Sequence, residues 1–130
     1  MGARLTITPQ DMKRSTVLNQ GWYPVEVVAV TEEPNAKGDS TNIIVDLVGI
    51  ASNDPEKNLG AGVPLRRYFT EKAPGFAVNF IKACGGNISD EGGTFDIASS
   101  VGRKLEAFVK PRPYEGRLTN DVADFRKLEG

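Results

Sequence analysis

Five segments of the chain have the residue pattern of β-strands, with apolar positions that repeat every second residue or form short valine- and isoleucine-rich runs. These segments cover residues 22–31, 41–50, 63–70, 103–110 and 118–128. Residues 32–40 are dense in turn-forming types, so the first two segments are expected to form an antiparallel hairpin. Residues 111–117 are expected to form the tip of a second hairpin, and 51–62 a mobile loop.

Between the third and fourth predicted strands the period changes from two to about 3.6, which indicates a helix. Pro74 lies near the expected helix start, and Gly85-Gly86 supplies a stop. The apolar face predicted for this helix consists of Phe76, Ala77, Phe80, Ile81 and Cys84. Residues 95–100 are expected to add one further helical turn.

Three strands, a helix and two strands follow one another in the order of the OB-fold, a five-stranded Greek-key barrel with a helix between strands three and four. The sequence therefore predicts a mainly β protein with an OB-fold-like barrel over residues 20–130. Residues 1–19 have no clear period and are interpreted as an arm or an extra strand. A different five-stranded barrel or sandwich would share the strand count.

The composition indicates one globular domain, because 130 residues bury a sizeable core and 16 basic residues nearly balance 17 acidic ones. No apolar run is long enough to span a bilayer. The N-terminus lacks the apolar segment of a signal peptide. We therefore expect a cytoplasmic protein without a membrane partner.

The chain has no histidine and one cysteine, which excludes histidine-based nucleophile activation, histidine metal ligands and cysteine-cluster zinc sites. No phosphate-binding glycine loop is present. The acidic pairs near residues 54 and 90 lack the spacing of a calcium loop. We expect a binding protein rather than an enzyme, with no cofactor, no metal and a buried structural thiol at Cys84.

The alternation in two predicted strands places aromatic and basic side chains outside the barrel. If residues 105, 107 and 109 point inward, Phe108 lies outside between Lys104 and Lys110. If Leu65 points inward, Arg66 and Tyr68 share the outer face. Trp22 and Phe69 are expected in the core.

Basic groups interleaved with aromatic rings are typical of grooves that bind single-stranded nucleic acid, because cations follow the phosphates while bases stack on the rings. Residues 102–117 agree with this pattern, since they carry five basic and two acidic residues. The predicted nucleic-acid-binding residues are Arg66, Arg67, Tyr68, Lys104, Phe108, Lys110, Arg112, Tyr114 and Arg117.

Simpler interpretations of these residues stay open. The N-terminal arm, the loop 51–62 or a dimer partner could cover Phe108 and Tyr68. Lys104 and Lys110 would then belong to an ordinary solvated strand face, and the residues of the hairpin tip would be ordinary turn residues. The near-neutral net charge of −1 also argues against strong electrostatic binding.

Several segments resemble small bacteriophage and prophage proteins encoded with replication and recombination genes, some of which are OB-fold single-stranded DNA-binding proteins. The resemblance covers roughly residues 20–128 and includes the helix end Cys84-Gly85-Gly86. It is carried by Gly21-Trp-Tyr-Pro-Val-Glu-Val, Gly102-Arg-Lys-Leu-Glu-Ala-Phe-Val-Lys, Tyr114-Glu-Gly-Arg and Asn120-Asp-Val-Ala-Asp-Phe-Arg.

The resemblance implies sequence-independent protection of single-stranded DNA during phage DNA replication or recombination, in the cytoplasm of a bacterial host cell. Replication or recombination proteins are expected partners, and self-association to a homodimer is a further expectation. The related proteins often end in a long acidic tail that recruits enzymes, which is not expected here because the last predicted strand ends near Gly130. The alternative hypothesis is a barrel that serves protein interaction or phage assembly without binding nucleic acid.

Overall fold

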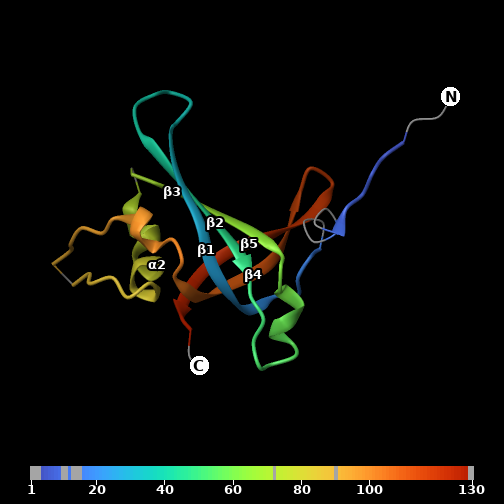
Figure 1. The fold of residues 1–130 in the computed structure, drawn as a ribbon. Helices are drawn as coiled ribbons and strands as arrows, with labels where there is room; N and C mark the ends of the chain where they lie inside the picture. The colour runs from blue at the N-terminus through green and yellow to red at the C-terminus, as the bar shows by residue number, and fades with distance from the viewer. Residues whose placement is uncertain (1–3, 10–11, 13–15, 72, 90, 129–130) are drawn as a thin grey trace.

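The computed structural model describes residues 4–9, 12, 16–71, 73–89 and 91–128, and in these ranges it is mainly β (Figure 1). Five antiparallel strands form one sheet in the order β3-β2-β1-β4-β5. The strands are β1 (Gly21–Pro34), β2 (Thr41–Gly49), β3 (Pro64–Thr70), β4 (Lys104–Tyr114) and β5 (Arg117–Lys127). The five predicted strands are therefore confirmed.

Strand β1 is shared between two halves of the sheet. Its first part, from Gly21 to Glu26, pairs with β4, and the part from Val25 to Pro34 pairs with β2. A register shift between Val27 and Ala29 marks a bulge, which increases the local twist of the strand. The edge strands β3 and β5 approach each other, and the rings of Phe69 and Phe125 lie 6.3 Å apart.

The helix between β3 and β4 is shorter than the sequence indicates. A 3₁₀ turn (η2, Pro74–Ala77) precedes a six-residue helix, α2 (Val78–Ala83). The prediction that Phe76 belongs to the apolar face is wrong, since its side chain is 72% exposed. The tighter 3₁₀ winding, with three residues per turn, rotates this position away from the face that the later residues bury.

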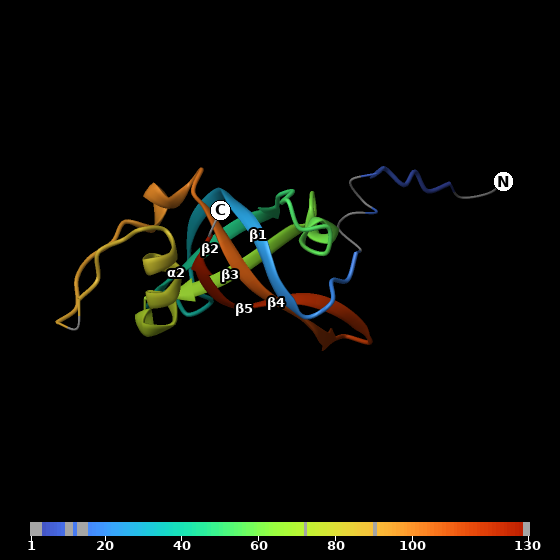
Figure 2. The same cartoon turned by 90° about the horizontal axis from the view of Figure 1, so that it is seen from below.

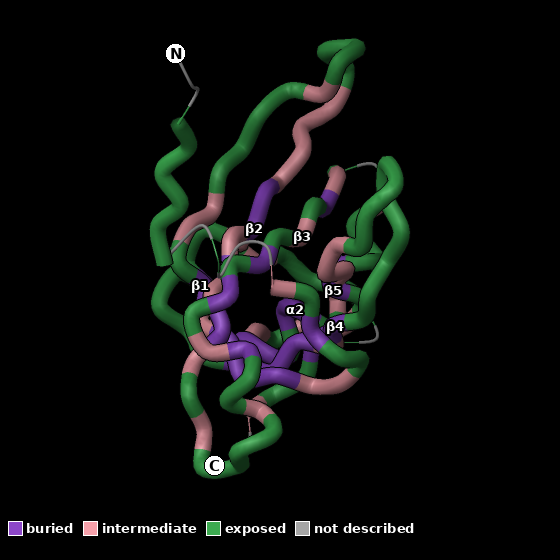
Figure 3. The backbone as a smooth tube through the Cα atoms, turned by 90° about the vertical axis from the view of Figure 1, so that its right-hand side faces the viewer, coloured by how far each residue is buried: buried purple, intermediate pink, exposed green. Residues whose placement is uncertain are grey.

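Helix α2 packs against β5 and closes one end of the core (Figures 1 and 2). Phe80 is fully buried, with its ring centroid 5.5 Å from that of Phe69 and 4.9 Å from that of Phe125. The buried stretches gather in the middle of the strands and beside the helix (Figure 3). One aromatic cluster thus connects the helix to both edge strands.

Two expectations about the core are confirmed. Residues 105, 107 and 109 of β4 are fully buried, as the alternation predicted. Cys84 is buried as well, and burial raises the pKa of its thiol to about 11, so the side chain stays protonated and unreactive at neutral pH.

The second hairpin is longer than predicted. Residues 111–114 and 117 continue the ladder, and only Glu115 and Gly116 form the turn, both with positive φ angles, as in a two-residue hairpin turn. The ladder tolerates Pro111 and Pro113 because β1 begins opposite Val109, which leaves β4 with a free edge beyond that point. The predicted hairpin is confirmed, but its tip is confined to Glu115 and Gly116 instead of covering 111–117.

Two shorter elements complete the described chain. A 3₁₀ turn, η1 (Lys57–Gly60), lies in the β2–β3 connection, and another, η3 (Ile97–Ser100), precedes β4. Residues 4–9 extend away from the sheet at the end opposite to α2 (Figures 1 and 2). In the described ranges, no helix has both the length and the apolar character that crossing a membrane requires.

We expect Phe80→Ala to lower the free energy of unfolding by about 3–5 kcal/mol, because it empties the contact between the two edge strands. The exposed Phe76→Ala is the matched control, with an expected change within about 0.5 kcal/mol. Urea unfolding followed by circular dichroism measures both values. Equal losses in the two variants would contradict the packing described above.

Candidate nucleic-acid interface

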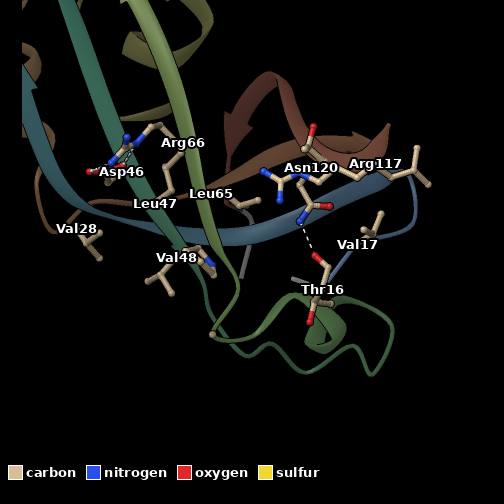
Figure 4. Close-up of a pocket in the computed structure, with 14 residues that line it drawn as sticks. Thr16, Val17, Val28, Asp46, Leu47, Val48, Leu65, Arg66, Arg117 and Asn120 are labelled. Carbon is tan, nitrogen blue, oxygen red and sulfur yellow. Dashed lines mark hydrogen bonds and ion pairs between the residues drawn. The ribbon is translucent and has the colours of Figure 1, made fainter. Parts of the chain in front are cut away.

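A groove of about 990 Å³ runs along β2 and β3 to the start of β5 (Figure 4). Its walls come from five parts of the chain that are distant in sequence. They are formed by Thr16, Val17, Val28, Asp46, Leu47, Val48, Gly62, Pro64, Leu65, Arg66, Arg117, Leu118, Thr119 and Asn120. Apolar side chains alternate here with hydroxyl, amide, guanidinium and carboxylate groups.

Asn120 holds the segment before β1 against the groove. Its side-chain oxygen accepts a hydrogen bond of 2.8 Å from the backbone N–H of Leu18, and its Nδ2 donates one of 2.8 Å to the carbonyl of Thr16. Leu18 itself is buried in the core. This paired contact makes Thr16 and Val17 a wall of the groove.

Arg66 and Tyr68 lie on the outer face of β3, as the alternation predicted. Arg66 stands opposite Asp46 of β2 in the ladder and forms a bidentate ion pair, with distances of 2.6 Å from Nε and 3.3 Å from Nη2. Its Nη1 lies 3.4 Å from the Tyr68 hydroxyl. Hydrogen bonds to Asp46 and Tyr68 raise the pKa of Arg66 above its ordinary value, so this side chain stays charged.

The β4–β5 hairpin brings a second group of predicted residues to the other end of the groove. Tyr114 and Arg117 are directly opposite each other beside the turn. Arg112 lies 4.0 Å from Asp121, which stands opposite Lys110. Arg117 lines the groove, and none of the described residues forms an ion pair with it.

Phe108 points to the outer face of β4, as predicted, but Trp22 of β1 partly covers it. The two rings lie 5.3 Å apart in an edge-to-face arrangement, and the guanidinium of Arg126 lies 4.2 Å from the Trp22 ring centre. Trp22 was expected in the core, and this expectation is wrong. The residue alternates with the buried Tyr23 and therefore faces outward.

Next to this aromatic pair lies an outward-facing carboxylate that is only 2% exposed. Glu106 accepts hydrogen bonds from Lys57 at 2.7 Å and from Arg126 at 3.2 Å. Burial by itself would raise the pKa of Glu106, but these two cations outweigh it and hold the pKa below its ordinary value. The pair with Lys57 ties the β2–β3 connection to β4.

The remaining two predicted residues are placed apart from the groove. Arg67 points to the same side of β3 as the buried Phe69, and its guanidinium lies 5.1 Å from that ring centre. Lys104 is exposed at the start of β4, ten residues before Tyr114, which corresponds to about 33 Å along a strand. These two side chains and the hairpin tip do not form one compact site.

The structure thus brings Arg66 and Arg117 into one groove and places Tyr68 and Tyr114 beside its two ends. Asp46 and Asn120 were missed by the sequence reasoning. Asp46 is a polar residue in an otherwise apolar strand, which was the available signal. No comparable signal marked Asn120 in the sequence, because its role depends on a contact with residues about a hundred positions earlier.

Within the described ranges, no group of three or more Cys, Asp or Glu side chains is arranged to hold a metal ion. No protein-family model matches the chain, and no curated protein matches its sequence. A function must therefore be inferred from the geometry and charge of the groove.

The Glu106 contacts predict a specific dependence of stability on pH. Because the pKa of Glu106 is lowered on folding, its contribution is complete above the ordinary value of 4.5 and is lost as the pH falls through the lower folded value. We expect Glu106→Gln to lower the free energy of unfolding by about 1–2 kcal/mol at pH 7 and by much less at pH 3. Urea unfolding at both pH values tests this, and an equal loss at both would contradict it.

Proposed function

We propose that this chain is a non-enzymatic single-stranded DNA-binding protein that acts in phage DNA replication or recombination. The observation that carries the proposal is the groove. It combines Arg117, which has no ion partner among the described residues, and an apolar floor with exposed tyrosines beside its two ends. Tyr68 and Tyr114 are 53% and 55% exposed, so each offers ring surface to a base. Base stacking of this kind tolerates any sequence.

The arrangement of the strands supports the proposal. An OB-fold closes its barrel by bringing strands three and five together, and it binds oligonucleotides on strands two and three and on the loop between strands four and five. Here β3 and β5 approach each other, and the groove lies on β2, β3 and the part of β5 next to the turn of the β4–β5 hairpin. We infer an OB-type barrel with its ligand in this position.

Positive charge near the hairpin supports contact with the phosphate backbone. Lys110, Arg112 and Arg117 follow one another along the hairpin. Of these three, Arg112 has an acidic neighbour, Asp121. Each phosphate that a protein cation neutralises releases counterions, so affinity falls as salt rises. A few such contacts give moderate binding, which fits a chain with a net charge of −1.

We expect a labelled dT oligonucleotide to bind at low salt, and Arg117→Ala to weaken binding to all sequences while lowering the salt slope by about one. Lys82→Ala, which removes an exposed cation from α2, is the matched control and should leave affinity and slope unchanged. Fluorescence anisotropy over a salt series measures both quantities. A wild-type protein that binds no oligonucleotide at low salt would contradict the proposal.

The fluorescence of the single tryptophan, Trp22, reports where on the protein the DNA binds. Trp22 lies beside Phe108 on the outer face of β1 and β4, outside the residues that line the groove. Binding in the groove should therefore change its fluorescence little. Strong quenching would instead place the DNA on the Trp22 and Phe108 rings.

One observation favours self-association through the N-terminal arm. Leu5 is 89% exposed and Ile7 61% exposed, on an arm that extends away from the sheet. An exposed apolar segment of this kind can add to a sheet edge of a second copy. We expect light scattering to report a dimer for the full chain and a monomer after removal of residues 1–9; a full chain that is monomeric at micromolar concentration would contradict this.

A further inference from the structure

The ion pair between Arg66 and Asp46 leaves a defined set of donors on the guanidinium. An arginine carries five N–H groups. Two of them, on Nε and Nη2, face the carboxylate of Asp46, and one on Nη1 faces the Tyr68 hydroxyl. Among the described residues, nothing accepts the two that are left, one on each terminal nitrogen. Arg66 therefore offers one N–H on each of its two terminal nitrogens to a ligand in the groove.

The charge around these donors decides which ligand they suit. The Asp46 carboxylate lies against the guanidinium and offsets its positive charge, and it would also repel a phosphate brought to the same place. The hydrogen-bonding capacity of the two donors is unaffected. The arrangement consequently favours an uncharged partner that presents two adjacent acceptors.

Among the DNA bases, guanine presents such a pair of acceptors in O6 and N7, and arginine reads it through two hydrogen bonds. Adenine offers N7 beside an amino donor, and thymine offers O4 beside a methyl group. Neither can satisfy both N–H groups of Arg66. An unpaired cytosine presents N3 beside O2, so cytosine is the competitor that the test must include. The paired donors thus discriminate guanine from adenine and thymine.

Tyr68 supplies the surface on which such a base can stack. It lies two residues from Arg66 on the same face of β3, and the guanidinium carbon is 6.0 Å from its ring centre. The exposed ring and the paired donors adjoin each other at one end of the groove. A base stacked on Tyr68 would bring its edge toward Arg66.

We propose that Asp46, Arg66 and Tyr68 form a guanine-reading position at the β2–β3 end of the groove, superimposed on otherwise sequence-tolerant binding. This inference rests on the proposed binding of single-stranded DNA. Tyr68 stacks the base, Arg66 donates to O6 and N7, and Asp46 fixes the guanidinium and suppresses its use as a phosphate contact.

The test compares four labelled oligonucleotides of equal length by fluorescence anisotropy: dT alone, and dT alternating with dG, with dA or with dC. Binding of the dC oligonucleotide as tightly as the dG oligonucleotide would overturn the choice of guanine. We expect the dG oligonucleotide to bind about tenfold more tightly than the dA oligonucleotide, which controls for purine stacking. Inosine retains O6 and N7 and should preserve the preference. 7-Deazaguanine lacks N7 and should remove most of it.

Three variants assign the preference to these residues. Arg66→Ala and the charge-conserving Arg66→Lys should both abolish the preference for dG over dA, measured as the ratio of the two affinities within each variant. Asp46→Asn should reduce the preference and steepen the salt slope by about one, because the released Arg66 becomes a phosphate contact. Lys82→Ala is the control and should keep the preference. Thermal unfolding of each variant verifies that it is folded.

The outcomes separate the inference from the proposed function. Equal affinity for the dG and dA oligonucleotides would overturn the guanine-reading position and leave DNA binding intact. A uniform loss of affinity in Arg66→Ala, with a lower salt slope, would overturn it too by making Arg66 a phosphate contact. Absence of binding to every oligonucleotide would overturn both.

Discussion

The rest of the structure depends on the contact of three phenylalanines that come from separate elements. Phe69 of β3, Phe80 of α2 and Phe125 of β5 meet around one point of the core. β3 and β5 are the two edges of the sheet, and they are not neighbours in its strand order. Aromatic packing draws them together. The geometry of the groove follows, because its lining includes residues of both edge strands.

The sharing of β1 between two partners is the second constraint. Its first residues pair with β4 and its later ones with β2, and the bulge at Val28 lies just after the overlap. A strand that changes partners in this way must bend, and the sheet bends with it. On the outer face, the Lys57–Glu106–Arg126 contacts fasten the β2–β3 connection to β4 and β5. Aromatic packing in the core and these ion pairs on the outer face therefore both hold the sheet in place.

This framework separates the basic and aromatic residues of the chain into distinct environments. Trp22 and Phe108 shield each other on the outer face, and Arg67 lies over a core ring. Tyr68 and Tyr114 keep exposed rings at the two ends of the groove, Arg66 is held by Asp46, and Arg117 has no ion partner among the described residues. Similar residue types thus acquire different surroundings through their neighbours: packing in one case and exposure to solvent in the other.

The sequence by itself determined the five strands, the place of the helix and the faces of β3 and β4, because these depend on local periodicity and on the alternation of side chains. It misplaced Phe76 and Trp22 and made the second hairpin too short. The causes are a 3₁₀ turn at Phe76, a cross-strand neighbour beside Trp22 and a free sheet edge beside the two prolines of β4. None of the three is visible in a local sequence pattern. It gave Arg66 and Arg117 as separate candidates. Only the tertiary structure placed them in one groove, with Asp46 and Asn120 beside them, because those contacts join positions from 20 to 104 residues apart.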